Sequence, residues 1–282
     1  MHLPLSSKLT PSLQWREAAG STNLELIQLA QAEPLPDFTV LVTANQQAGR
    51  GRSGRVWETA PNTALAISVL LRPRLDSQED LSKLGWLPLL GGLAMAQTVQ
   101  QLLGEDPQSL AHQTGVKWPN DVLVAGKKIC GVLSELVPLN GSGDANRFGA
   151  SVGVVIGAGI NLSQTTEQLP VETATSLTLA GAELPFSLEE RFDLVLSGYL
   201  ERLSYWYQRF TDARLSAVVS GLRQAVIENC VTLGQPVRAI LPGDTEQLGK
   251  AVTIDDSGRL VLEANGVVWP VAAGDIVHLR HN

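Results

Sequence analysis

Three arginines and three glycines lie between Gly49 and Arg55, in the sequence GRGRSGR. Glycine lets backbone N–H groups face a ligand, and arginine binds the oxygens of phosphates and carboxylates through paired hydrogen bonds. The segment closely follows Thr39–Thr43, whose β-branched, apolar residues predict a buried strand. We therefore predict an anion-binding loop. A solvated loop and an arginine–glycine segment for nucleic acid are the alternatives.

A second polar group, KWPND, spans Lys117–Asp121. Pro119 cannot donate a hydrogen bond to a neighbouring strand, so it should end the strand and place Asn120 and Asp121 beyond it. A carboxylate beside a carboxamide suits Mg²⁺ that is held together with substrate phosphates. An ordinary Asn-Asp turn is the alternative, but the nearby lysine favours a phosphate site.

Two further groups lie on expected strands. Lys127 and Lys128 are neighbours, and because neighbours on a strand face opposite sides, one can point inward. Cys130 should pack as a small hydrophobic residue. The sequence GAGIN, Gly157–Asn161, ends an apolar strand, where glycine indicates a bulge, a turn or the close approach of a ligand. It lacks the dinucleotide-binding pattern, so a Rossmann site is not expected.

The elements that must position these groups follow from periodicity and capping signals. Capping boxes should open the first and third of the expected helices, Thr22–Gln31, Leu87–Leu103 and Ser187–Phe210. The expected strands are Thr39–Thr43, Ala64–Leu71, Thr114–Trp118, Val122–Val124, Lys128–Leu136 and Ser151–Ala158, with a hairpin turn at Ala125-Gly126 and a loop at Asn140–Asn146.

From Cys230 onward the pattern changes to short β-type runs separated by tight turns. About fifty residues of this kind indicate a small β-barrel. We expect two domains, 1–229 and 230–282, which agrees with a total of 282 residues. The fold class is α+β, with a mixed sheet, helices and the C-terminal barrel.

The overall composition excludes several classes of protein. The net charge of −7 disfavours nucleic-acid binding by the chain as a whole. Only two cysteines, Cys130 and Cys230, are present, and no signal peptide is apparent, so a reducing cytoplasm is expected. Proline and glycine interrupt the uncharged stretch Leu84–Val99, which indicates a buried helix rather than a membrane span. The four histidines lack metal-ligand spacing.

Taken together and in this order, the motifs resemble those of biotin–protein ligases over nearly the whole chain. Besides GRGRSGR and KWPND, the resemblance rests on Ser21–Asn23, on KKICG ending at Gly131, on GAGIN and on the C-terminal β module. It implies a catalytic domain related to class II aminoacyl-tRNA synthetases, followed by an SH3-like barrel. It also implies that biotin is activated with ATP and Mg²⁺ to biotinyl-5′-AMP and transferred to a lysine of biotin carboxyl carrier protein of acetyl-CoA carboxylase.

The resemblance assigns roles to matching positions. Catalytic roles fall to Lys128, Arg52 and Asp121, and we expect Asp121 to help deprotonate the acceptor lysine. Biotin binding is implied for Ser21, Thr22, Asn23, Gln46, Gly49, Arg50, Gly51, Arg52, Lys128, Gly131, Gly157 and Gly159. ATP or adenylate binding is implied for Arg52, Arg55, Trp57, Lys117, Asn120, Asp121, Lys128 and Asn161, with Asp121 and Asn120 nearest Mg²⁺.

Two features depart from parts of the family. About fifteen residues precede the first helix motif, too few for the helix-turn-helix domain of members that also act as repressors, so a monofunctional form without DNA binding is expected. Thr173–Leu177 has no tryptophan where some members stack adenine. The alternatives are a lipoate–protein ligase and a non-catalytic biotin-responsive regulator. Both a monomer and a homodimer remain open.

Overall fold

A seven-stranded mixed sheet forms the centre of the computed structural model, which describes residues 1–106, 108–139, 151–241, 245–272 and 274–279. The strand order is β1-β2-β5-β9-β8-β7-β6, and only β1 and β2 run parallel. The expected loop Asn140–Asn146 lies outside the described residues. The strands are β1 Leu13–Arg16, β2 Thr39–Thr43, β5 Ala64–Leu71, β6 Thr114–Lys117, β7 Asp121–Val124, β8 Lys127–Leu139 and β9 Ser151–Asn161.

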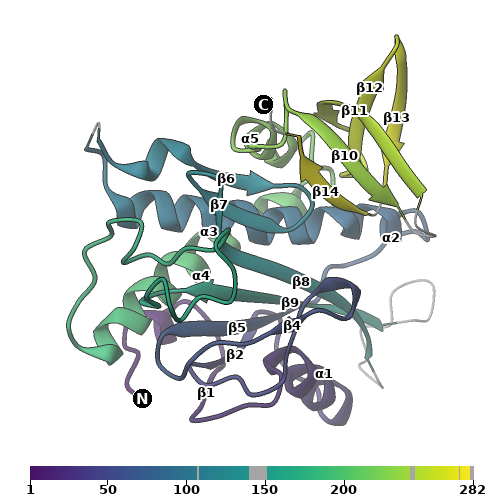
Figure 1. Ribbon diagram of the computed structural model, residues 1–282. Helices are drawn as coiled ribbons and strands as arrows, with labels where there is room; N and C mark the ends of the chain where they lie inside the picture. The colour runs from purple at the N-terminus through teal and green to yellow at the C-terminus, as the bar shows by residue number, and fades with distance from the viewer. Residues whose placement is uncertain (107, 140–150, 242–244, 273, 280–282) are drawn as a thin grey trace.

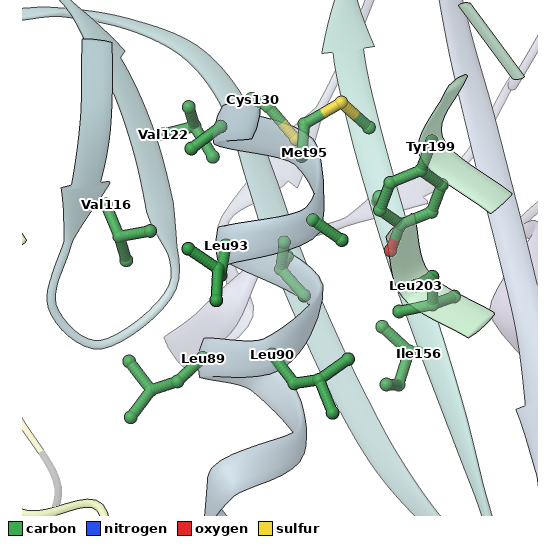
Figure 2. Close-up of a cluster of buried hydrophobic side chains, with 14 of the residues drawn as sticks. Leu89, Leu90, Leu93, Met95, Val116, Val122, Cys130, Ile156, Tyr199 and Leu203 are labelled. Carbon is green, nitrogen blue, oxygen red and sulfur yellow. The ribbon is translucent and has the colours of Figure 1, made fainter. Parts of the chain in front are cut away.

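Helices cover both faces of this sheet (Figure 1). The short helix α1, Thr22–Ala32, packs on one face against β5, β8 and β9. On the other face, α3 (Leu87–Leu103) and α4 (Leu188–Asp212) pack against each other and both contact the sheet. Figure 2 shows Leu93 of α3 beside Val116 of β6 and Tyr199 of α4 beside Ile156 of β9. The remaining helices are α2 Asp80–Lys83, α5 Leu222–Glu228 and the 3-10 turns η1 Ser6–Lys8, η2 Arg52–Gly54, η3 Leu84–Trp86 and η4 Leu110–Gln113.

The uncharged stretch around α3 is a buried helix, as predicted. Most of its side chains are enclosed by the sheet and α4. No helix in the described part of the chain is long and apolar enough to cross a membrane.

Alternation along β9 gives the sheet two different faces. Ile156, Ala158 and Ile160 face the main core around α3. Val155 faces α1, and Gly157 and Gly159 follow on the same side. Because these glycines have no side chains, other side chains can pack directly on the backbone of β9 at both positions.

Several expected element ends differ from the structure by one to three residues, and two of them bear on the site. The capping box at Thr22 is wrong by one residue: Ser21 is the N-cap of α1, and Glu25 accepts a hydrogen bond from Gly20 N (2.8 Å). The Thr22 hydroxyl instead lies within hydrogen-bonding distance of Gln46 and Ser68. The strand expected to end at Ala158 continues to Asn161, because β5 and β8 pair with it through the glycines.

The C-terminal module is a five-stranded antiparallel sheet with the order β13-β12-β11-β10-β14. Two tryptophans from outside this module hold its turn at 255–259. Trp86 Nε1 donates to Asp256 O (2.8 Å), and Trp118 Nε1 donates to Gly258 O (3.0 Å). The strands are β10 Pro236–Leu241, β11 Thr245–Ile254, β12 Leu260–Ala264, β13 Val267–Val271 and β14 Asp275–His278. The boundary after Asn229 stays a prediction, because buried side chains of β10 and β11 join the main core.

We expect Trp86→Phe to loosen this docking. The substitution removes the indole N–H from a fully buried side chain and should lower the free energy of unfolding by about 1–2 kcal/mol. Urea unfolding followed by circular dichroism measures the change. Trp15→Phe is the matched control, since the Trp15 indole donates to the exposed carboxylate of Glu17. Equal losses in the two variants would contradict a docking role for Trp86.

Candidate active site

Residues 49–57 form a small hairpin that we call the cover loop. It consists of β3 (Gly49–Arg50), the turn η2 and β4 (Val56–Trp57). A Cβ atom at Gly159 would lie 2.7 Å from the Trp57 ring, so the indole rests directly on the backbone of β9. The cover loop therefore lies over the face of the sheet that carries Gly157 and Gly159.

A cavity of about 360 Å³ lies beneath the cover loop, bounded by α1, the sheet and the C-terminal module. This volume suits a small organic ligand. All the residues predicted for the site line this cavity except Gly49 and Asn161. Those that do are Ser21, Thr22, Asn23, Gln46, Arg50, Gly51, Arg52, Arg55, Trp57, Lys117, Asn120, Asp121, Lys128, Gly131, Gly157 and Gly159.

The two exceptions have structural partners. Asn161 is buried, donates to Thr175 O (2.9 Å) and accepts from Gln164 Nε2 (2.9 Å). Through Thr175 it holds the segment that pairs with the backbone of Lys128. Gly49 pairs with Trp57, and a Cβ there would lie 2.2 Å from Trp57 O, so the position needs glycine to close the hairpin. ATP contact by Asn161 and biotin contact by Gly49 stay predictions.

Lys128 supplies the positive charge at the centre of the cavity wall. Its Nζ lies 2.7 Å from Asp121 Oδ1 and 5.9 Å from the centre of the Trp57 ring. It also lies over Gly131, where a Cβ would be 3.0 Å from Nζ. Lys117 lines the same wall, and burial lowers its pKa. An anion bound here would meet two lysines.

Each arginine of the cover loop has a different partner. Arg50 Nη2 contacts both carboxylate oxygens of Glu135, at 2.9 and 2.8 Å. Arg52 donates to Asn120 Oδ1 and to the carbonyl of Gly274, both at 3.0 Å. Burial lowers the pKa of Arg52.

Arg55 forms an ion pair with Asp275 of the C-terminal module (2.5 Å). With Arg52 on Gly274, two of the three arginines thus join the cover loop to this module. The predicted anion-binding loop is therefore closed in part by strands far away in the sequence.

The opposite end of the cavity is uncharged and rich in hydrogen-bonding groups. Gln46 Oε1 accepts from Thr22 N (2.9 Å), and the Thr22 hydroxyl lies 2.8 Å from Ser68 Oγ. Ser68 donates to Asn23 Oδ1 (2.6 Å). A Cβ at Gly157 would be 2.1 Å from the same Asn23 oxygen, so glycine is required for this packing.

The oxygens predicted to hold Mg²⁺ face cationic side chains. Asp121 is paired with Lys128, and Asn120 Oδ1 accepts from Arg52. A metal ion coordinated by both oxygens would have to displace these cations, so the present arrangement does not fit one. The described residues also contain no group of three or more His, Cys, Asp or Glu side chains that could hold a metal ion.

Sequence reasoning missed several residues that line or support the cavity. Glu135 contacts Asn23 and Arg50. Its position could have been inferred, because it lies two and four residues beyond Leu133 and Gly131 on one face of β8. Ser68 is fully buried in an apolar strand, and no pattern indicated it. Ile240 and Asp275 reach the cavity from the C-terminal module, which no local pattern linked to the site.

Comparison with known proteins agrees with this geometry. Residues 19–161 match the model of the biotin/lipoate A/B protein ligase family, and residues 232–279 match the biotin protein ligase C-terminal domain. The chain belongs to the biotin/lipoate A/B protein ligase family. The family match covers α1, the strands β2 to β9, the cover loop and both lysines of the cavity wall.

One relative of this chain, a biotin–[acetyl-CoA-carboxylase] ligase of Mycobacterium tuberculosis, is 35% identical over 94% of this chain and 90% of its own length. The bifunctional ligase/repressor BirA of Bacillus subtilis is 29% identical over 94% of this chain and 73% of its own length. The biotin protein ligase of Aquifex aeolicus, solved with biotin and ATP, has a TM-score of 0.70 at 25% identity and covers 96% and 100% of the two chains.

Proposed function

We propose that this enzyme activates biotin with ATP to biotinyl-5′-AMP and transfers biotin to a lysine of the biotin carboxyl carrier protein of acetyl-CoA carboxylase. One observation carries the proposal: a single cavity joins an uncharged, glycine-floored end to a cationic wall. The first suits the ring of biotin, and the second suits its carboxylate and the phosphates of ATP. The named relatives and the ligand-bound Aquifex protein support the same reaction.

In the first half-reaction, the biotin carboxylate attacks the α-phosphorus of ATP, a P–O bond forms, and pyrophosphate leaves. Two anions must approach each other, so the reaction needs fixed positive charge and alignment more than a protein nucleophile. Lys128 would contact both the carboxylate and the α-phosphate. Lys117 and Arg55 would bind the remaining phosphates, and Arg52 would hold the adenylate under the cover loop.

In the second half-reaction, the amine of the acceptor lysine attacks the acyl carbon, the amide bond forms, and AMP leaves. The ammonium group must first lose a proton. Asp121 is the carboxylate beside Lys128, and we propose that it assists this loss. The cover loop would exclude water from the mixed anhydride, and Trp57 would lie over the middle of the adenylate.

The uncharged end would hold the ring system of biotin. Ser21, Thr22 and Gln46 offer hydroxyl, backbone and amide groups, and the backbone over Gly49–Arg52 closes this end from above. Gly131, Gly157 and Gly159 would admit the ligand close to the sheet. Asn23 lines the wall but bonds to protein groups at both ends of its amide.

Mg²⁺ would enter with ATP and supply charge neutralisation at the phosphates. Because Asn120 and Asp121 are paired with arginine and lysine, a role as its ligands requires those pairs to rearrange. We propose no step that depends on this.

Incubation with ATP, Mg²⁺, biotin and a biotin-carrier domain, followed by streptavidin detection, tests the function. We expect ATP-dependent label on the carrier, and its absence would refute the proposal. A lipoate ligase would label a lipoyl domain with lipoate instead, but the match to a biotin ligase C-terminal domain favours biotin. We propose no DNA binding, and salt-sensitive, biotin-dependent retardation of operator-like DNA would contradict this.

Gly157→Ala should block the biotin end. The new methyl group would overlap Asn23 Oδ1, so either the floor or α1 must shift. Overpacking of about 1–3 kcal/mol predicts a biotin Kd about tenfold or more higher, measured by titration calorimetry. Gly153→Ala is the control on the same strand, where the new atom would meet the flexible ends of Leu70 and Leu139. An unchanged Kd for Gly157→Ala would place biotin elsewhere.

The finer architecture and setting are also proposals. We propose that the catalytic sheet is of the class II aminoacyl-tRNA synthetase type and that the C-terminal strands complete an SH3-like barrel. Both cysteines are buried free thiols, and burial raises the pKa of Cys130, which packs in the core as predicted. Free thiols and an ATP-dependent reaction suit the cytoplasm.

A further inference from the structure

Glu135 on β8 joins two parts of the site that are distant in sequence. Its carboxylate oxygens lie 2.9 and 2.8 Å from Arg50 Nη2 in the cover loop. One of them also accepts from Asn23 Nδ2 in the first turn of α1 (2.9 Å). A single carboxylate thus links the cover to the wall of the uncharged end.

The Asn23 end of this link is fixed. Asn23 is 5% exposed, and its Nδ2 also donates to Leu133 O (3.1 Å) while its Oδ1 accepts from Ser68. The backbone of Gly157 packs against the same amide. Asn23 therefore cannot turn without breaking several buried contacts, and it holds Glu135 in one orientation.

The same hydrogen-bonded network continues to Thr22 and Gln46, which line the end of the cavity proposed for biotin. Ser68 lies beside Thr22, and Thr22 is bonded to Gln46. The network therefore runs from Gln46 to Arg50 through protein groups alone. A ligand that bonds to Thr22 and Gln46 would therefore strengthen the network that holds the partner of the cover loop.

The Arg50 end is suited to opening and closing. The side chains of Arg50 and Glu135 are 43% and 25% exposed, so solvent weakens their attraction. A cover that must open in each turnover needs a contact of this modest strength. Arg52 and Arg55, by contrast, reach Asn120 and the C-terminal module beside the cationic wall.

We propose that Glu135 is a positioning residue that latches the cover loop through Arg50 when the biotin end is filled. This inference rests on the proposed function and adds a residue to it. The latch would keep the adenylate enclosed until the acceptor arrives, without contacting the reacting atoms.

The test compares Glu135→Gln, Glu135→Ala, Arg50→Ala, the double alanine variant and the exchanged pair Arg50→Glu/Glu135→Arg. Asp76→Asn is the matched control, because it breaks the exposed ion pair with Arg74 outside the site. Limited trypsin digestion followed by mass spectrometry gives the cleavage rate after Arg52 and Arg55, with and without biotin. Release of preformed radiolabelled adenylate is measured on the same proteins.

With biotin bound, we expect cleavage and adenylate release about fivefold faster in Glu135→Ala and in Arg50→Ala, a change typical of one partly screened ion pair. The double variant should be no worse than either, because both changes remove one interaction. The exchanged pair should recover part of the protection. Asp76→Asn should match the wild type, and the ATP Kd should be unchanged throughout.

Wild-type rates in both alanine variants, or additive effects in the double variant, would overturn the latch. Glu135→Gln keeps an acceptor for Asn23 but loses the charge. A lower melting temperature in any variant without faster cleavage would mean that Glu135 only supports α1, which also overturns the proposal. If the wild-type protein makes no adenylate, the proposed function is refuted. If it makes adenylate but biotin does not slow the cleavage of its cover loop, only the latch is refuted.

Discussion

Lys128→Ala is expected to lower the rate of biotin-dependent ATP–pyrophosphate exchange about a thousandfold. Lys128 is the cation placed between the uncharged end and the phosphate wall, and it is already held by Asp121 and the Trp57 face. Removing one preorganised electrostatic contact from a water-poor site typically lowers kcat by about 10²–10³. The exchange assay isolates the first half-reaction from the transfer to the carrier.

Lys127→Ala provides the matched control for this experiment. Lys127 precedes Lys128 on β8, is exposed, and points to the other side of the strand. Its removal changes the net charge equally and should leave the exchange rate within about twofold, as is usual for surface substitutions. If Lys128→Ala retained more than a tenth of the wild-type rate, the central place given to this lysine would be wrong.

Arg52→Gly should release the adenylate before transfer and so label proteins other than the carrier. The substitution removes the hydrogen bonds to Asn120 and Gly274 that hold the cover loop over the cavity. Each hydrogen bond from a charged group typically contributes about 1.5–3 kcal/mol, so the loss of two should make adenylate release at least tenfold faster. Filter retention of radiolabelled adenylate gives the release rate, and streptavidin detection of added albumin gives the bystander labelling.

Added backbone freedom alone could mimic this result, so Ser53→Gly is the control. Ser53 has a positive φ of 55° in the same turn, and glycine adopts that conformation readily while all three arginines remain. We expect labelling confined to the carrier in this control. Labelling confined to the carrier in Arg52→Gly as well would remove the retention role of Arg52.

The sheet and its helices could be predicted well because periodicity is a local property. Strands β2 and β5 and helix α3 have the expected bounds. The error at α1 has a physical reason. Thr22 has a typical capping side chain, but its hydroxyl lies within hydrogen-bonding distance of Ser68 and Gln46, so the cap falls on Ser21. A residue recruited to a site departs from the local rule.

The site was predictable where its residues come in compact motifs and not where they arrive singly. Gly157, Lys128 and Arg52 lie in short runs of unusual composition and line one cavity. Asp275 and Glu135 are isolated acidic residues, and their ion pairs with the cover loop depend on the meeting of distant strands. Alternation along β8 could have placed Glu135, but no local pattern could have placed Asp275.

The contacts of Arg52 and Arg55 with the C-terminal module also determine when the cavity can close during synthesis of the chain. Arg52 and Gly274 are 222 residues apart, and Arg55 and Asp275 are 220 apart. Because chains emerge and fold from the N-terminus, the sheet and α1 can form on the ribosome well before these partners exist. A nascent chain that ends at α5 would have the floor of the cavity but not the contacts that close it. These closing contacts of the cover loop could then form only after β14 has been made.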